Sequence, residues 1–209
     1  MEGYDSDDLE GMIEGVTTGA MSAINELQSA GLDQNNMSNM MKSISSSASK
    51  GLSRLENSKL LDNASKLPGL LNTITSSTLK ATKEIKVQGF DPNDSAILGS
   101  IIEEVISGAT ESIEEITMAN ESGFDLQKTL SQIATGAISG AQKISSNSTI
   151  SDDIKRKAIE TLKEKTSELN IPNKNSVTLD DLDMTAPVLV STIPAVSYTH
   201  LRAHETRSY

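Results

Sequence analysis

An apolar pattern that recurs every 28 to 31 residues over residues 1–170 constrains the fold of this 209-residue chain more than any other feature. The anchors of its six copies are Val16, Ile44, Ile74, Val105, Ile133 and Leu162. Other apolar residues recur at fixed offsets from the anchors, near −7, −3, +4, +8 and +11. Such offsets trace one stripe along an α-helix. The repeat therefore predicts an all-α fold of about six amphipathic helices.

Small side chains follow most of the anchors, at the third and fourth positions. These pairs are Gly19 and Ala20, Ser47 and Ala48, Ser77 and Thr78, Gly108 and Ala109, and Gly136 and Ala137. Small residues let a neighbouring backbone approach closely. Gly15-x-x-x-Gly19 and Gly136-x-x-x-Gly140 resemble a membrane helix-dimer motif, but neither stretch is long and apolar enough to span a bilayer. We therefore expect antiparallel helices in a short solenoid or layered bundle.

The connecting segments contain residues that start and stop helices. Three glycines are predicted to end helices with a positive φ, namely Gly31, Gly89 and Gly123. Asp7, Asp94 and either Ser151 or Asp152 are predicted to cap the next helices. Pro68 is expected in the first turn of the third helix, where a missing N–H costs nothing.

Composition excludes several classes of function. The net charge of −11 argues against a nucleic-acid partner, since phosphate contacts need excess Lys and Arg. Cysteine is absent, which excludes disulfides, thiolate metal sites and cysteine nucleophiles. No apolar run is long enough for a transmembrane segment. Aromatic residues make up 2% of the chain, so the core must come from Ile, Leu, Met, Val and Ala.

Acidic loops are the first candidates for chemistry. Asp5–Asp8, Asp91–Asp94 and Asp180–Asp183 offer oxygen ligands suited to Ca²⁺, but none has the glycine and glutamate of an EF-hand loop. Helix capping and turn formation explain the first two loops. A calcium ion at Asp180–Asp183 stays an alternative. We assign no metal or cofactor ligand.

Other polar clusters also have plain structural interpretations. Ser45–Ser47 lies between Lys42 and Lys50, which leaves a Ser–Lys nucleophile as a remote alternative. The pairs Glu103-Glu104 and Glu114-Glu115 point in different directions around their helices and are interpreted as solvated faces. The basic stretch Lys155–Lys157 is interpreted as ion pairing with Asp152, Asp153 and Glu160. No catalytic residue is assigned, and no small-molecule substrate is evident.

Both histidines, His200 and His204, lie in Val196–Thr206. An H-x-x-x-H pair on a helix is one way to hold zinc. The stretch is, however, similar to the conceptual translation of a transposase-type sequencing adapter. We therefore interpret residues 196–209 as adapter read-through of a metagenomic fragment and exclude the histidines as a site.

Two resemblances bear on the class of protein. The motif G-[YF]-D-x-[DN]-D, followed by V-x-x-G-A, occurs at Gly3–Leu27 and Gly89–Ile116, and more loosely at Gly123–Ile144. It resembles poorly characterised bacterial repeat proteins expected to be exported. Met1 aligns with Val87 inside a repeat, so we expect the reading frame to be longer, with any signal peptide upstream. Thr185–Ala195 resembles the opening strand of a bacterial Ig-like domain.

We thus expect a helical repeat domain at 1–170, an acidic linker at 171–184 and a truncated first Ig-like strand at 185–195. The resemblances imply a non-enzymatic spacer or interaction scaffold of a bacterial exported or cell-surface protein, with a protein or cell-surface partner not identified. One alternative is a helical binding module for a protein or glycan. Another is a non-catalytic fragment of a larger enzyme.

Overall fold

The computed structural model describes residues 6–26, 34–57, 64–86, 89–119, 124–144, 152–171, 174 and 177–179. Within these ranges the chain forms seven α-helices and no strand, which confirms the all-α prediction. The helices are α1 (Ser6–Glu26), α2 (Gln34–Asn57), α3 (Leu67–Ala81), α4 (Ser95–Thr110), α5 (Ile113–Ala119), α6 (Leu126–Ile144) and α7 (Asp152–Glu168). Short 3-10 turns, η2 (Ala64–Lys66) and η3 (Thr82–Glu84), flank α3. Six helices contain one anchor each, and α5 follows α4 after a turn at Glu111 and Ser112.

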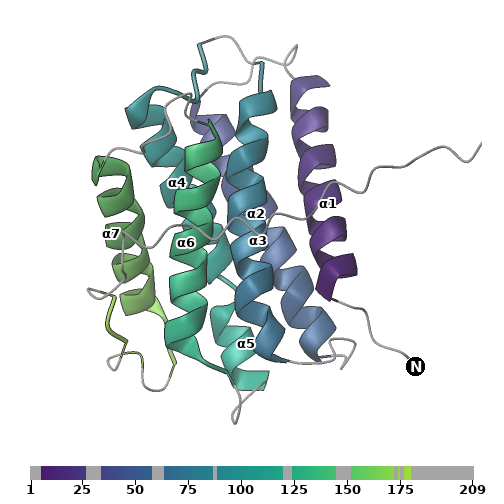
Figure 1. The fold of residues 1–209 in the computed structure, drawn as a ribbon, viewed down its shortest axis with the longest axis vertical. Coiled ribbons are helices and arrows are strands. Elements are labelled where there is room, and N and C mark those ends of the chain that lie inside the picture. Colours follow the sequence, from purple (N-terminus) through teal and green to yellow (C-terminus); the bar gives the residue numbers. More distant parts are fainter. Residues whose placement is uncertain are drawn as a thin grey trace, which may run out of the picture.

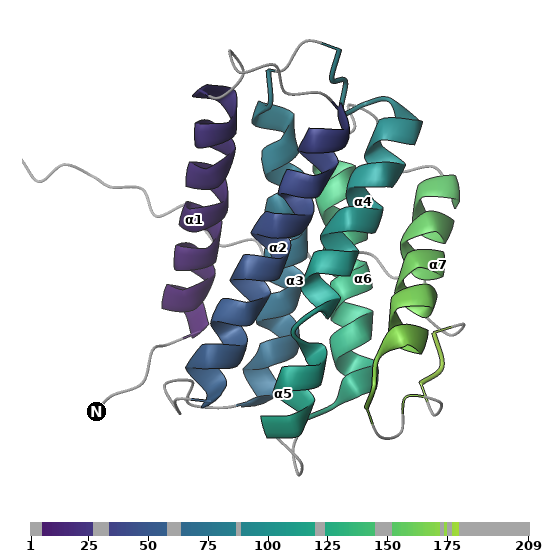
Figure 2. The ribbon, with the colours of Figure 1, turned by 180° about the vertical axis from the view of Figure 1, so that it is seen from behind.

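The helices form two layers. Figure 1 shows α1, α3 and α6 side by side in one layer, and Figure 2 shows α2, α4 and α7 in the other. The colours show that helices of one layer run in the same direction, opposite to those of the other layer. Consecutive major helices are therefore antiparallel, as expected.

The most extensive contacts nevertheless join parallel helices two repeats apart, α3 with α6 and α2 with α4. Hydrogen bonds reflect this spacing. The Ser45 hydroxyl donates to the Val105 carbonyl over 2.8 Å, and the Asn72 amide donates to Gln132 over 3.1 Å, each pair 60 residues apart in sequence. The packing unit is therefore a two-helix hairpin rather than a single helix.

The predicted stripe lies between the layers in most helices. Ile74, Val105, Ile133 and Leu162 are fully buried, and the buried apolar residues that the structure describes are Ile, Leu, Met, Val and Ala. Val16 departs from the pattern, because 65% of its surface is exposed. The first anchor was therefore wrong as a core residue. Helix α1 instead buries Leu9, Met21 and Ile24.

Several predicted helix ends are present. The Asp94 side chain caps α4 by accepting from the N–H groups of Ala96 and Ile97. Pro68 lies in the first turn of α3. Gly89 has the predicted positive φ, 80°, but it does not end a helix, because the preceding 3-10 turn η3 ends at Glu84. One cap was missed, since the Asp125 carboxylate accepts from the Lys128 N–H over 2.9 Å at the start of α6.

The remaining predicted ends are less informative. Asp152 begins α7. Gly31, Gly123, Ser151 and the side chain of Asp7 lie outside the described part of the chain.

Glycines form narrow seams between helices of the same layer. A Cβ atom on Gly136 would overlap the Asn72 carbonyl oxygen and the Thr75 hydroxyl of α3, and one on Gly140 would lie 2.8 Å from the Ser76 carbonyl oxygen. Gly108 of α4 meets the backbone of α2 in the same way. Gly108 and Gly136 confirm the predicted close approach, and Gly140 extends it by one helical turn.

Gly15 and Gly19 of α1 do not take part in such a seam. A Cβ atom at either position would have nothing within 4 Å. The two glycine motifs that look alike in sequence thus have different surroundings. Within the described residues, a neighbouring helix lies against the motif of α6 but not against the motif of α1.

Part of the expected linker packs on the helices. Ile171 and Leu179 are buried in the common core, and the Gln127 side chain exchanges two hydrogen bonds of 2.8 Å with the backbone of Thr178. The expected strand at 185–195 and the segment 196–209 lie outside the described residues.

Candidate functional site

The loop Asp91–Asp94 was the one acidic loop with a fully described structure. Asp91 accepts from the backbone N–H of Asn93 over 2.8 Å and from its side-chain amide over 3.0 Å. The hydrogen bond from the Asn93 backbone, followed by that from its side chain, lowers the pKa of Asp91 below its usual value. With Asp94 occupied as the cap of α4, this loop has the turn and capping roles expected of it.

Metal sites can be assessed only within the described residues, where no group of three His, Asp or Glu side chains is placed to hold an ion. The loop Asp180–Asp183 and the histidines His200 and His204 fall outside that part of the chain, as does Asp5. In the same described part, no helix combines the length and apolar character needed to cross a membrane.

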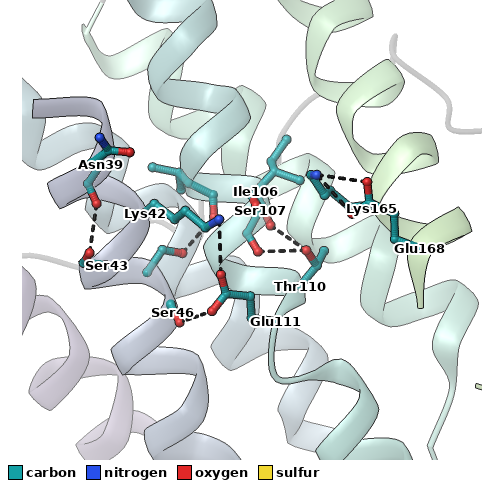
Figure 3. Close-up of polar contacts among 12 residues, drawn as sticks. Asn39, Lys42, Ser43, Ser46, Ile106, Ser107, Thr110, Glu111, Lys165 and Glu168 are labelled. Atoms are coloured by element: carbon teal, nitrogen blue, oxygen red, sulfur yellow. Dashed lines mark hydrogen bonds and ion pairs between the residues drawn. The ribbon is translucent and has the colours of Figure 1, made fainter. Parts of the chain in front are cut away.

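Ser45 and Ser46 of the serine run lie in the seam between α2 and α4, whereas Ser47 is exposed. Ser45 donates to the Val105 carbonyl, and Ser46 donates to Glu111 over 2.5 Å. Lys50 donates to the same carboxylate over 3.0 Å, and Lys42 lies 3.4 Å from its other oxygen. Figure 3 shows Lys42 and Ser46 converging on Glu111. Both lysines therefore contact a carboxylate, and neither is placed by an observed contact to activate a serine.

Glu111 is the centre of this cluster, and the sequence interpretation missed it. Burial raises the pKa of the Glu111 carboxyl, but hydrogen bonds from Ser46 and Lys50 lower it more, so the pKa lies below its usual value. The cluster joins residues 61 and 65 positions apart. Only the knowledge that contacts join helices two repeats apart would have connected Glu111 with Ser46.

Three of the four paired glutamates contact another segment of the chain. Glu103 forms an ion pair of 2.5 Å with Lys157 of α7, and Glu115 accepts from Ser53 of α2 over 3.1 Å. Glu114 accepts from the backbone N–H of Asn170 over 2.5 Å. The prediction of purely solvated faces was incomplete for these three, because each carboxylate has a partner on another segment.

The basic stretch Lys155–Lys157 is paired largely as expected. Lys155 lies 3.3 Å from Asp152, while Arg156 lies 2.5 Å from Asp153 and 3.8 Å from Glu160. The spacing is mainly three residues rather than four. These contacts leave a charge-balanced surface on α7 rather than a basic patch.

Within the described structure, a few large hydrophobic side chains are exposed to solvent. They are Met12 and Val16 of α1 and Met118 of α5. Met12 and Val16 lie one helical turn apart and share a side of α1 with Gly19. This side of α1 is the candidate interaction surface.

The chain matches no protein-family model, no curated protein and no solved structure. The fold and its surfaces therefore define a class only at the level of an all-α, two-layered helical repeat.

Proposed function

We propose that this chain is a non-enzymatic spacer or interaction scaffold of a bacterial exported or cell-surface protein. The observation that carries the proposal is that the clustered polar side chains form hydrogen bonds between helices. Ser45, Ser46, Lys50 and Glu111, which could otherwise suggest a reactive cluster, form bonds across the seam between α2 and α4.

The architecture supports the same proposal. Stacked repeats contact mainly their neighbours and share one continuous core, so their length and shape persist over a long array. Here α1 contacts α3, α3 contacts α6, and α4 contacts α7 within their layers. The resemblance of Gly3–Leu27 and Thr185–Ala195 to exported repeat proteins and Ig-like domains supports a cell-surface location. An array of this kind ahead of Ig-like domains suits a spacer.

A second candidate is a helical binding module for a protein or a glycan. The observation that favours it is a row of exposed polar residues on α2, formed by Asn36, Asn39, Ser43 and Ser47. Side-chain amides and hydroxyls can hydrogen-bond to sugar hydroxyls or to a polar protein surface. The third alternative, a non-catalytic part of a larger enzyme, has no residue in the described structure to argue from.

The spacer and the binding module differ in whether the chain binds a ligand through the exposed side of α2. We would screen the purified chain against glycan arrays and bacterial surface extracts, beside a variant with Asn39→Ala and Ser43→Ala on the exposed side of α2. A spacer gives no saturable binding to either. A saturable ligand that is lost in the double variant, with the melting temperature unchanged, would contradict the spacer and support the binding module.

A further inference from the structure

The glycines of α4 and α6 that meet the preceding helix of the same layer lie at +3 or +7 from the anchor. Together with positions −4 and 0, which lie on the same side of a helix, we call these four positions the receiving face. The receiving faces are Leu70, Ile74, Ser77 and Ala81 in α3, Ile101, Val105, Gly108 and Ser112 in and just after α4, and Thr129, Ile133, Gly136 and Gly140 in α6. All twelve residues are buried. The close approaches at Gly108, Gly136 and Gly140 are to the preceding helix of the same layer.

The receiving face of α1 consists of Met12, Val16, Gly19 and Ala23. Met12 is 54% and Val16 65% exposed, Ala23 is exposed, and a Cβ atom at Gly19 would have nothing within 4 Å. The equivalent residues of α6 are buried. Helix α1 therefore has the surface of an inner helix, but no helix of the described part of the chain covers it.

The receiving face of α2 is also open. Its residues are Met40, Ile44, Ser47 and Gly51, which are half-buried or exposed. Figures 1 and 2 place α1 and α2 at the same end of the two layers, opposite α7. We call the receiving faces of α1 and α2 together the N-terminal edge. It crosses both layers.

The N-terminal edge contains no charged residue. The opposite edge is different, because α7 exposes Glu160, Lys163, Glu164 and Ser167 at positions −2, +1, +2 and +5. Terminal repeats of a solenoid need a polar outer face to stay in solution. Helix α7 therefore has the composition of a terminal cap, whereas the N-terminal edge has that of an internal interface.

The helix that covers the receiving face of α6 indicates what kind of segment would cover the N-terminal edge. Helix α3 presents Asn72, Thr75, Ser76 and Leu79 to the glycines of α6, which are uncharged residues at positions −2, +1, +2 and +5. We propose that the N-terminal edge docks one further helical hairpin of the same repeat, which precedes α1 and runs parallel to α1 and α2 within each layer. The inference rests on the proposed scaffold and extends it by naming the partner of this edge.

A second copy of the chain fits this edge less well. Continuing both layers with a second copy would bring α7 against α2, and so place the charged Glu160, Lys163 and Glu164 over Met40 and Ile44. Removing charged side chains from water against apolar ones costs free energy even where the charges are paired. A hairpin of the α3–α4 type lowers this cost, because the equivalent positions of α3 are uncharged and those of α4 include one charge, Glu103, rather than three.

The absence of cysteine from the chain allows a direct test. Residues 64–123 are copied ahead of Met1, which adds one hairpin of the α3–α4 type. Val16→Cys provides a thiol reporter in the N-terminal edge. Met118→Cys, made only in the original copy, is the matched control because Met118 is also 65% exposed but lies on α5. Maleimide labelling rates are compared between the parent and the extended chain.

We expect labelling of the Val16→Cys thiol to slow at least about ten-fold in the extended chain, while labelling of the Met118→Cys thiol is unchanged. Adding Gly19→Arg to the extended chain should restore fast labelling at position 16, because a long side chain at the seam keeps the hairpin away. Equal rates in the parent and the extended chain overturn the proposal, whether or not the added hairpin is helical.

A second result would also overturn it. If labelling of the parent at position 16 slows as protein concentration rises, a second copy occupies the edge instead. Thiol labelling reports docking alone, so it fails or succeeds independently of the ligand screen that tests the proposed function.

Discussion

Replacing Gly136 by alanine tests the close packing of α6 against α3. The added Cβ atom would lie 3.0 Å from the Asn72 Cα and 2.5 Å from the Asn72 carbonyl oxygen, where ordinary contacts begin near 3.4 Å. Both atoms belong to the backbone of α3, so a rotamer change cannot relieve the overlap. Overpacking of a tight core costs about 1–3 kcal/mol, and alanine returns about 1 kcal/mol through its better helix propensity.

The expected net loss is therefore about 1–2 kcal/mol, since two backbone atoms place the cost toward the upper part of that range. For a chain of this size, such a loss lowers the melting temperature by about 2–8 °C. The measurement is thermal and urea unfolding of Gly136→Ala followed by circular dichroism.

Gly11→Ala is the matched control for this substitution. Gly11 is exposed within α1, and a Cβ atom there would meet nothing within 4 Å. The same chemical change should therefore raise stability by about 0.5–1 kcal/mol through propensity alone. If Gly136→Ala is as stable as the parent while Gly11→Ala behaves as expected, the helices of one layer are not in close contact and the architecture described above is refuted.

Four further outcomes are expected. Asp94→Ala removes the cap of α4 and should cost about 1 kcal/mol in urea unfolding, whereas Asp94→Asn should restore most of it. Ser49→Ala should stabilise the chain by about 1 kcal/mol, because the Ser49 hydroxyl is buried without a hydrogen-bond partner and its removal ends a desolvation penalty; a loss of stability would show that the hydroxyl is bonded. The lowered pKa of Glu111 means that its ionised carboxylate stabilises the fold above the usual glutamate pKa of 4.5, and that this stabilisation is lost as the pH falls through the lower pKa of the folded state. Glu111→Gln should therefore flatten the dependence of the unfolding free energy on pH below about 4.5. An unchanged pH profile would contradict this. Deleting residues 196–209 should leave the melting temperature unchanged, and a decrease would refute their interpretation as adapter read-through.

Local features of this protein could be predicted because they depend on neighbours in sequence. A stripe near every fourth residue needs only the α-helical period, which is why the six anchored helices were found. The cap at Asp94 and the start at Pro68 follow from which N–H groups a first turn leaves free. The narrow seams at Gly108 and Gly136 were also expected, since only a missing side chain permits such an approach.

The pairing of helices was decided by the tertiary structure. Copies of one repeat have nearly the same stripe, so the stripe does not say whether a helix packs mainly on the next copy or on the one after it. Parallel packing two repeats apart brought Glu111 to Ser46 and Lys50, a cluster that no local pattern contains. The same cause explains the error at Val16. Val16 and Ile133 occupy equivalent positions in sequence, but burial depends on the presence of a neighbouring helix. Of these two helices, α1 and α6, only α6 has one on that side within the described structure.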